Sequence, residues 1–130
     1  LESEIAALAA ERRTDADLAA MRAAQERLLA RLATAAAEQE DAAFHGTIAA
    51  ASHNAKLIEA ANALTSHIFR WAEVGRRHEV LTLAERREII AVEHGDILAA
   101  IAAGNAADAR NALRRHLLNG RARLLSSVSR

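Results

Sequence analysis

Four polar residues of this chain, Asp41, His45, His94 and His116, fall on or beside the apolar faces that helical periodicity predicts. Charged and imidazole side chains rarely enter a protein core unless a partner there binds them. Asp41 and His45 are four residues apart, so on a helix they lie one turn apart on a single face. Carboxylates and imidazoles bind hard to borderline divalent metals, and the four residues therefore indicate a metal site.

Each of these residues also has an ordinary structural interpretation. An Asp–His pair one turn apart occurs by chance on helix surfaces. His94 lies between Ile90 and Ile97, which fits a neutral core histidine that bonds to a carbonyl or a carboxylate. The same alternative holds for His116, which follows Leu113 on its own stripe. One shared cation accounts for all of them together, and this favours the metal interpretation.

The ligand set limits what else binds. Three imidazoles and one carboxylate around a divalent ion leave a net positive charge, and they suit zinc, nickel, copper, iron or manganese. An octahedral ion would keep two positions for water or for an anion, and a small chelating carboxylate is the simplest such anion. Glu93 is adjacent to His94 but is rotated about 100° around the helix, which argues against a ligand role.

Other polar residues have weaker claims to the site. Arg70 flanks an apolar stripe and is a candidate to bind a ligand carboxylate, although a solvated arginine is an equal alternative. Asn54 is first a helix N-cap and second a ligand contact. His67 is either a pocket wall or an exposed surface residue. His53 and His78 fall at helix ends and are expected to be exposed.

Composition predicts an all-α protein of one domain. The 130 residues include five glycines, no proline, no cysteine and only 2% aromatic residues. The formal net charge is zero, so no global field favours nucleic acid or an anionic membrane. The arginines at positions 114, 115, 121 and 123 lack interleaved aromatics and indicate a solvated basic face. No apolar run reaches membrane-spanning length and no export signal opens the chain, so a cytoplasmic protein is expected.

Periodicity and capping residues predict six helices joined by short connections, which favour an antiparallel bundle. They are expected at about 1–12, from Thr14 to near Glu38, at about 39–52, from Asn54 to Gly75, from Thr82 to Gly104, and from Asn105 through Leu124. The chain starts in helical pattern without a methionine, and we therefore expect it to be a fragment that lacks an N-terminal part.

Four motifs stand in an order and spacing that can be compared with known families: Asp41-Ala-Ala-Phe-His45, Ser52-His-Asn54, Glu93-His94 and Arg115-His116-Leu117. Together they resemble the FCD domain, the C-terminal effector-binding domain of the FadR-like branch of GntR transcription regulators. Leu1-Glu2 followed by Leu8-Ala-Ala is similar to the family's first helix, so the resemblance covers essentially the whole chain. Six helices are closer to the VanR-like subgroup than to the seven-helix type. The family often has a glycine where this chain has His53.

The resemblance implies a single FCD-type ligand-binding domain over residues 1–130, an antiparallel helical bundle with a central cavity for the metal and its ligand. In metal-binding members the positions matching Asp41, His45, His94 and His116 hold a divalent ion, with zinc expected ahead of nickel or manganese. A small organic carboxylate then binds at the metal, and the domain passes this event to a winged-helix DNA-binding domain in a homodimer. The winged helix is absent from these residues, so DNA binding is expected only of a longer protein.

The sequence therefore favours a metal-dependent sensor of a small carboxylate over two alternatives. A metal-assisted enzyme acting on a small acid would use the same open coordination positions, but no serine, cysteine or lysine is placed as a nucleophile. A purely structural dimerisation bundle would use the histidines as hydrogen-bonded core residues. We therefore expect a protein that is not an enzyme and that has no membrane partner.

Overall fold

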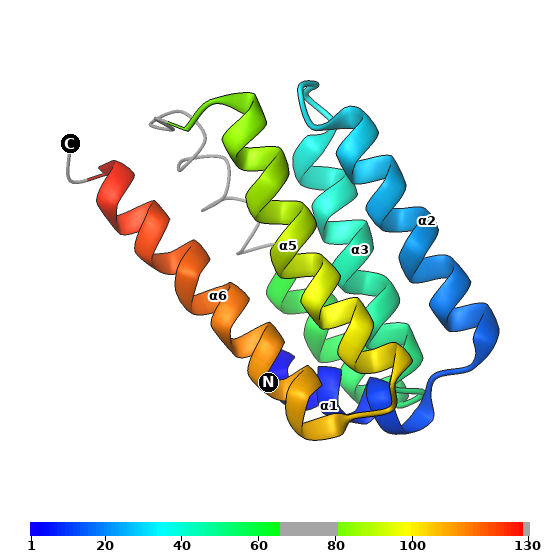
Figure 1. Cartoon of the computed structure of the whole chain (residues 1–130). Coiled ribbons are helices and arrows are strands. Elements are labelled where there is room, and N and C mark those ends of the chain that lie inside the picture. The colour runs from blue at the N-terminus through cyan, green and yellow to red at the C-terminus, as the bar shows by residue number, and fades with distance from the viewer. Residues whose placement is uncertain (66–80, 129–130) are drawn as a thin grey trace.

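The computed structural model describes residues 1–65 and 81–128, and all regular structure in these ranges is α-helical. The helices are α1 (Glu2–Arg12), α2 (Asp15–Arg31), α3 (Ala37–Ala51), α5 (Leu83–Ala102) and α6 (Ala106–Val128). Residues 55–65 are helical as well. The chain ascends in α2, descends in α3 and α5 and ascends again in α6, so α2/α3 and α5/α6 are antiparallel pairs (Figure 1). The predicted all-α class is confirmed.

Helix starts follow the capping residues that the sequence indicated. The Thr14 side chain accepts from the Asp17 backbone N–H, and the Asp17 carboxylate accepts from the Thr14 backbone N–H, which completes a capping box at α2. Thr82 caps α5 by accepting from the Glu85 N–H, and its hydroxyl donates to the Glu85 carboxylate. Asn105 accepts from the Asp108 N–H at the start of α6. These caps set where three helices begin.

The end of α2 differs from the prediction, which placed it near Glu38. The helix ends at Arg31, and residues 32–36 form turns before α3. The Thr34 hydroxyl donates to the Arg31 carbonyl and accepts from the Ala36 N–H. Side-chain hydrogen bonds of this kind compete with the helical ladder for backbone groups, so the threonine stops the helix although alanines surround it.

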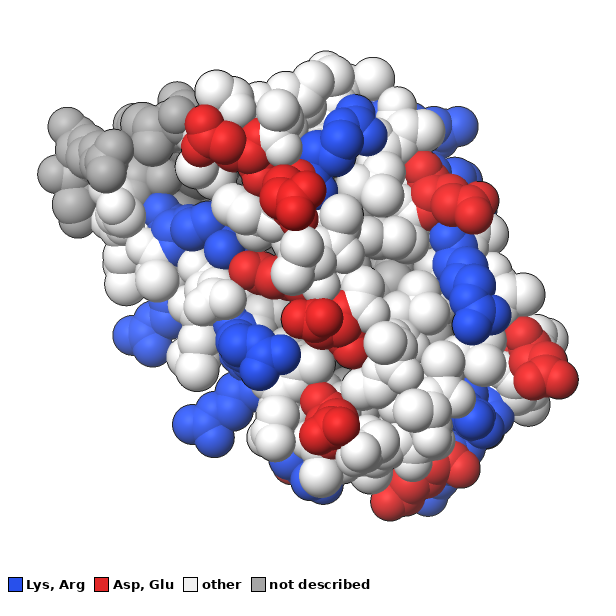
Figure 2. Space-filling view, in the orientation of Figure 1, with Lys and Arg blue, Asp and Glu red and all other residues white. Residues whose placement is uncertain are grey.

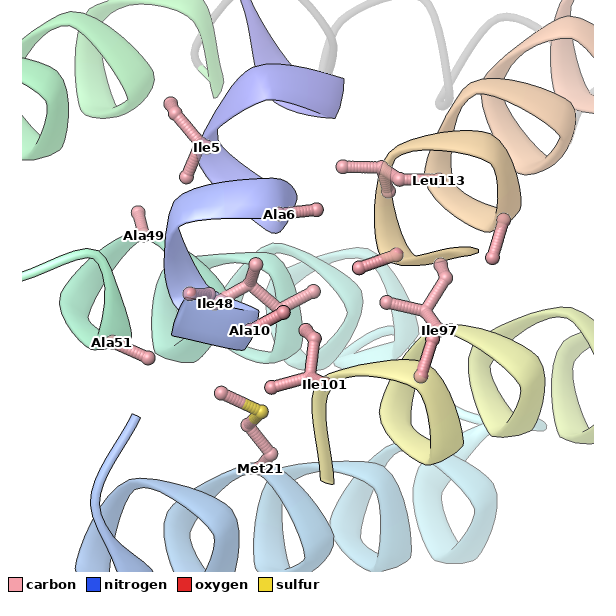
Figure 3. Close-up of a cluster of buried hydrophobic side chains, with 14 of the residues drawn as sticks. Ile5, Ala6, Ala10, Met21, Ile48, Ala49, Ala51, Ile97, Ile101 and Leu113 are labelled. Atoms are coloured by element: carbon pink, nitrogen blue, oxygen red, sulfur yellow. The ribbon is translucent and has the colours of Figure 1, made fainter. Parts of the chain in front are cut away.

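A core of isoleucine, leucine and alanine joins the helices. Side chains from α1, α2, α3, α5 and α6 point toward one another around the alanine-rich face of α1 (Figure 3). The largest fully buried side chains include Phe44, Ile48, Ile97, Ile101 and Leu113. Small alanines on α1 let neighbouring helices approach closely, and α1 packs against α3, α5 and α6. This packing holds α3, α5 and α6, which carry the candidate site, in fixed relative positions.

Two leucines lie at the edge of the buried faces of their helices. Leu64 and Leu117 are 37% and 36% exposed, whereas Ala61 and Leu113, one turn away, are buried. The connection between α5 and α6 matches its prediction: Gly104 has a positive φ of 72°, the left-handed conformation common just after a helix. Within residues 1–65 and 81–128, no helix is long and apolar enough to cross a membrane.

Candidate metal centre

The three predicted histidine ligands come together from three helices. His45 lies on α3, His94 on α5 and His116 on α6, and one ring nitrogen from each lies within 4.8 Å of the others. His94 is fully buried, while His45 and His116 are partly exposed. The packing of the bundle therefore brings residues distant in the sequence to one point.

Asp41 lies beside the same nitrogen atoms. Its Oδ1 is 3.4 Å from His94 Nε2 and 3.7 Å from His45 Nε2. The aspartate side chain is 39% exposed, so the cluster opens to solvent on this side. Asp41 thus lies beside two of the three histidines, His45 and His94.

The hydrogen-bond partners of His94 determine which nitrogen faces the cluster. His94 Nδ1 lies 2.8 Å from Gln25 Oε1, and Gln25 Nε2 donates to the Ile90 carbonyl at 3.4 Å. Since the amide oxygen only accepts, His94 Nδ1 carries the hydrogen and Nε2 presents its lone pair. The Phe44 ring stacks on the His94 ring, with centroids 4.2 Å apart, and fixes its plane.

His116 has the same arrangement with a different partner. Its Nδ1 donates to Glu93 Oε1 at 2.7 Å, so its Nε2 is the nitrogen that faces His94. The two Nε2 atoms of His94 and His116 are 3.3 Å apart. Two lone pairs that face each other at this distance repel unless a cation or a proton lies between them.

Burial disfavours a proton on His94 and on His45. It lowers the pKa of His94 far below the usual histidine value, and the neighbouring imidazoles His45 and His116 lower it further. Burial also lowers the pKa of His45, although Asp41 opposes this effect. These two rings are therefore neutral near pH 7, which is the state in which imidazole binds a metal.

Glu93 is held as a carboxylate by three donors on α6. His116 and Asn119 each donate to it, and Arg123 donates to both of its oxygens at 3.1 Å. Burial alone would raise the pKa of Glu93, but the hydrogen bonds from His116, Arg123 and Asn119 lower it to about 2. Glu93 contacts His116 at Nδ1, and the other ring nitrogen of His116 faces His94, so Glu93 lies behind His116.

Sequence reasoning missed Gln25 and the role of Glu93. Signals for both were present: Gln25 interrupts the apolar stripe of α2 between Met21 and Leu28, and the three donors to Glu93 share one face of α6. These contacts depend on how α2, α5 and α6 are rotated against one another, which cannot be predicted from local sequence patterns.

The predicted ligand-binding residues have mixed outcomes. Asn54 Oδ1 accepts from the backbone N–H groups of Lys56 and Leu57, so its capping role is confirmed, and its ligand contact stays a prediction. His67 and Arg70 lie outside the described residues. The central cavity also stays a prediction.

The arginines of α6 are mixed with acidic groups. Arg115 lies 3.7 Å from Asp96 of α5, and Arg123 binds Glu93. On the face shown in Figure 2, red and blue side chains lie beside one another and neither sign forms a continuous surface.

Comparison with known proteins adds three findings. The family model described as the FCD domain matches residues 1–119. The chain is 36% identical to the Uxu operon transcriptional regulator of Escherichia coli K12 over 96% of this chain and 50% of that protein. It is 34% identical to the HTH-type transcriptional regulator LutR of Bacillus subtilis 168 over 92% of this chain and 55% of that protein.

A solved structure agrees with the fold. E. coli McbR/YncC superposes with a TM-score of 0.81 at 25% identity, over 98% of this chain and 60% of that one. The chain spans about half the length of the two regulators that it matches, the Uxu operon regulator and LutR.

Proposed function

Because this chain belongs to the FCD domain family, whose relatives here are GntR-type transcription regulators, we propose that it is the effector-sensing domain of such a regulator. In this proposal Asp41, His45, His94 and His116 bind one divalent metal ion, with zinc ahead of nickel or manganese. A small organic carboxylate binds at the metal. The role is sensing and not catalysis, in keeping with relatives that are named as regulators.

The facing Nε2 atoms of His94 and His116 are the observation that carries the proposal. Their separation is 3.3 Å. Two nitrogens that each bind one zinc ion at about 2.0–2.1 Å lie at most about 4 Å apart, and the observed separation falls within that limit. The Asp41 carboxylate supplies a negative charge on the solvent side of the same atoms. Donor type, lone-pair direction and spacing therefore all fit a divalent metal.

The charge of the site supports an anionic effector. One aspartate against a divalent ion leaves a net charge of about +1, which favours a carboxylate at the remaining coordination positions. When bound, the ion would supply Lewis acidity toward carboxylate oxygens. Asn54, His67 and Arg70 are proposed as further contacts to the effector, with Arg70 pairing with a carboxylate.

Signalling in this proposal uses a homodimer of a longer cytoplasmic protein with an N-terminal DNA-binding domain. Metal and effector would favour one arrangement of the dimer through their unequal affinity for two arrangements. The coverage supports this layout, since the regulators that the chain matches are about twice its length.

Metal analysis followed by thermal unfolding tests the proposal. Mass spectrometry of the chain loaded in turn with zinc, nickel and manganese should find a bound ion for at least one of them. A panel of small mono-, di- and tricarboxylates should then contain an acid that raises the melting temperature. At 100 times its Kd, such an acid adds about 2.7 kcal/mol to the free energy of unfolding.

The matched variants are His94→Ala, within the cluster, and His53→Ala, an exposed histidine outside it. Chelation and His94→Ala should each abolish the response to the acid, while His53→Ala should retain it. A chain that binds none of the three metals would contradict the proposal. Conversion of the bound acid to a product would indicate the metal-assisted enzyme instead.

A further inference from the structure

Two side chains outside the proposed ligand set contact the two histidines whose Nε2 atoms face each other. Gln25 of α2 contacts His94, and Glu93 of α5 contacts His116. We infer that Gln25 and Glu93 are positioning residues that decide which ring nitrogen of each histidine faces the site. The inference rests on the proposed metal function and extends it beyond the ligands.

Gln25 is itself fixed in one orientation. Its Nε2 donates to the Ile90 carbonyl, which can only accept, so its Oε1 must be the atom that faces His94 Nδ1. Ile90 and His94 are one turn apart on α5, so the amide of Gln25 bridges a backbone carbonyl and a ring on the same helix. A flipped amide would place its oxygen against the Ile90 carbonyl oxygen and lose that hydrogen bond. The hydrogen of His94 is therefore held on Nδ1.

Glu93 is held just as firmly by donors one or two turns apart on α6. Arg123 donates from Nη1 to Oε2 and from Nη2 to Oε1, and Asn119 donates to Oε2. This leaves Oε1 directed at His116 Nδ1, 2.7 Å away. A carboxylate behind a histidine both orients the ring and increases the electron donation of its other nitrogen.

The two supports differ in charge, and this difference predicts unequal histidines. His116 has an ionised carboxylate behind it, whereas His94 has a neutral amide. Conversion of Gln25 to glutamate would retain an acceptor for His94 and add a negative charge. That change should preserve metal binding and weaken the binding of an anionic effector, because the net positive charge of the site falls.

The first experiment needs no variant. Long-range ¹H–¹⁵N NMR on the metal-free chain reports which nitrogen of each imidazole carries hydrogen. We expect His94 and His116 both to carry it on Nδ1 near pH 7. A hydrogen on Nε2 of His94 in the wild-type chain would overturn the inference, whatever the metal binding proves to be.

The second experiment uses matched variants and measures zinc affinity by competition with a chelator. Gln25→Leu and Glu93→Gln should each weaken zinc binding by about 10- to 100-fold. Gln25→Glu should bind zinc at least as tightly as the wild type. Gln39→Leu and Glu88→Gln change exposed residues of the same types on α3 and α5 and should leave affinity unchanged.

The outcomes distinguish metal binding by the histidines from the positioning of their rings by Gln25 and Glu93. If the wild type binds zinc and Gln25→Leu binds it within twofold of the same affinity, the positioning role is wrong and the metal function stands. If the wild type binds no zinc, nickel or manganese, the metal function is wrong, and the NMR result alone decides whether Gln25 and Glu93 fix the rings. Rescue by Gln25→Glu, together with the NMR signature, excludes a merely structural effect of the leucine.

Discussion

His53 adopts a left-handed backbone conformation that residues other than glycine seldom adopt. Its φ is +51°, directly after the C-cap of α3, where a left-handed glycine is common. The imidazole Nε2 lies 2.7 Å from Asp17 Oδ2 in the first turn of α2. The residue therefore combines a strained backbone with a contact that joins the end of α3 to the start of α2.

Substitutions at this position separate the two effects. His53→Gly and His53→Ala both lose the Asp17 contact, but only glycine removes the left-handed penalty. We expect His53→Gly to be more stable than His53→Ala by about 1 kcal/mol. Urea unfolding of the metal-free variants measures the difference, and equal midpoints for the two variants would contradict it.

At the scale of the element, the start of α2 couples capping to charge. Partial burial alone would raise the pKa of Asp17, but hydrogen bonds from the Thr14 backbone, the His53 ring and the Thr14 hydroxyl lower it below its usual value. A carboxyl group with a lowered pKa in the folded state stabilises the protein above its unfolded-state pKa, about 3.9. That contribution disappears as the pH falls through the folded-state value.

We therefore expect the stability difference between the wild type and Asp17→Asn to shrink as the pH falls below about 4. Urea unfolding of the metal-free proteins across this range provides the measurement. Asp15→Asn is the matched control, because Asp15 is an exposed aspartate in the same first turn. An equal pH dependence for the two variants would show that the contacts of Asp17 contribute nothing.

The helix starts could be predicted because each cap depends on residues three positions apart. Thr14, Thr82 and Asn105 set theirs through side chains that reach the next turn. The end of α2 was not predicted, because Thr34 acts through a turn that competes with an otherwise favourable alanine-rich helix. Local sequence signals thus predict the helix starts, but they do not predict the end of α2, where no glycine stops the helix.

In the candidate site, too, some residues could be predicted from local patterns and others could not. Periodicity placed Asp41, His45, His94 and His116 on inward faces, and the structure brings them together. The partners of the rings lie on other helices, and their contacts depend on how α2, α5 and α6 rotate against one another. Gln25 therefore looks like an ordinary interruption of an apolar stripe until the helices are assembled.

At the scale of the whole molecule, the histidine cluster joins distant parts of the chain. His45 and His94 belong to helices that are separated in sequence by the segment from position 52 to position 82, and His116 follows after a further turn. These long connections must close before the cluster exists, so we expect the cluster to form after the folding transition state. A ligand of the complete cluster then stabilises the native state and not the species that precede it.

From this placement of the cluster we expect a bound metal to act on the unfolding rate. Saturating zinc should slow unfolding roughly in proportion to the stability it adds and should leave the folding rate nearly unchanged. Stopped-flow chevron plots with and without zinc measure both limbs, and a faster folding limb would show that the cluster forms before the barrier. A metal-loaded domain would then persist far longer between unfolding events, so its lifetime in a cell, and not only its shape, would depend on the metal.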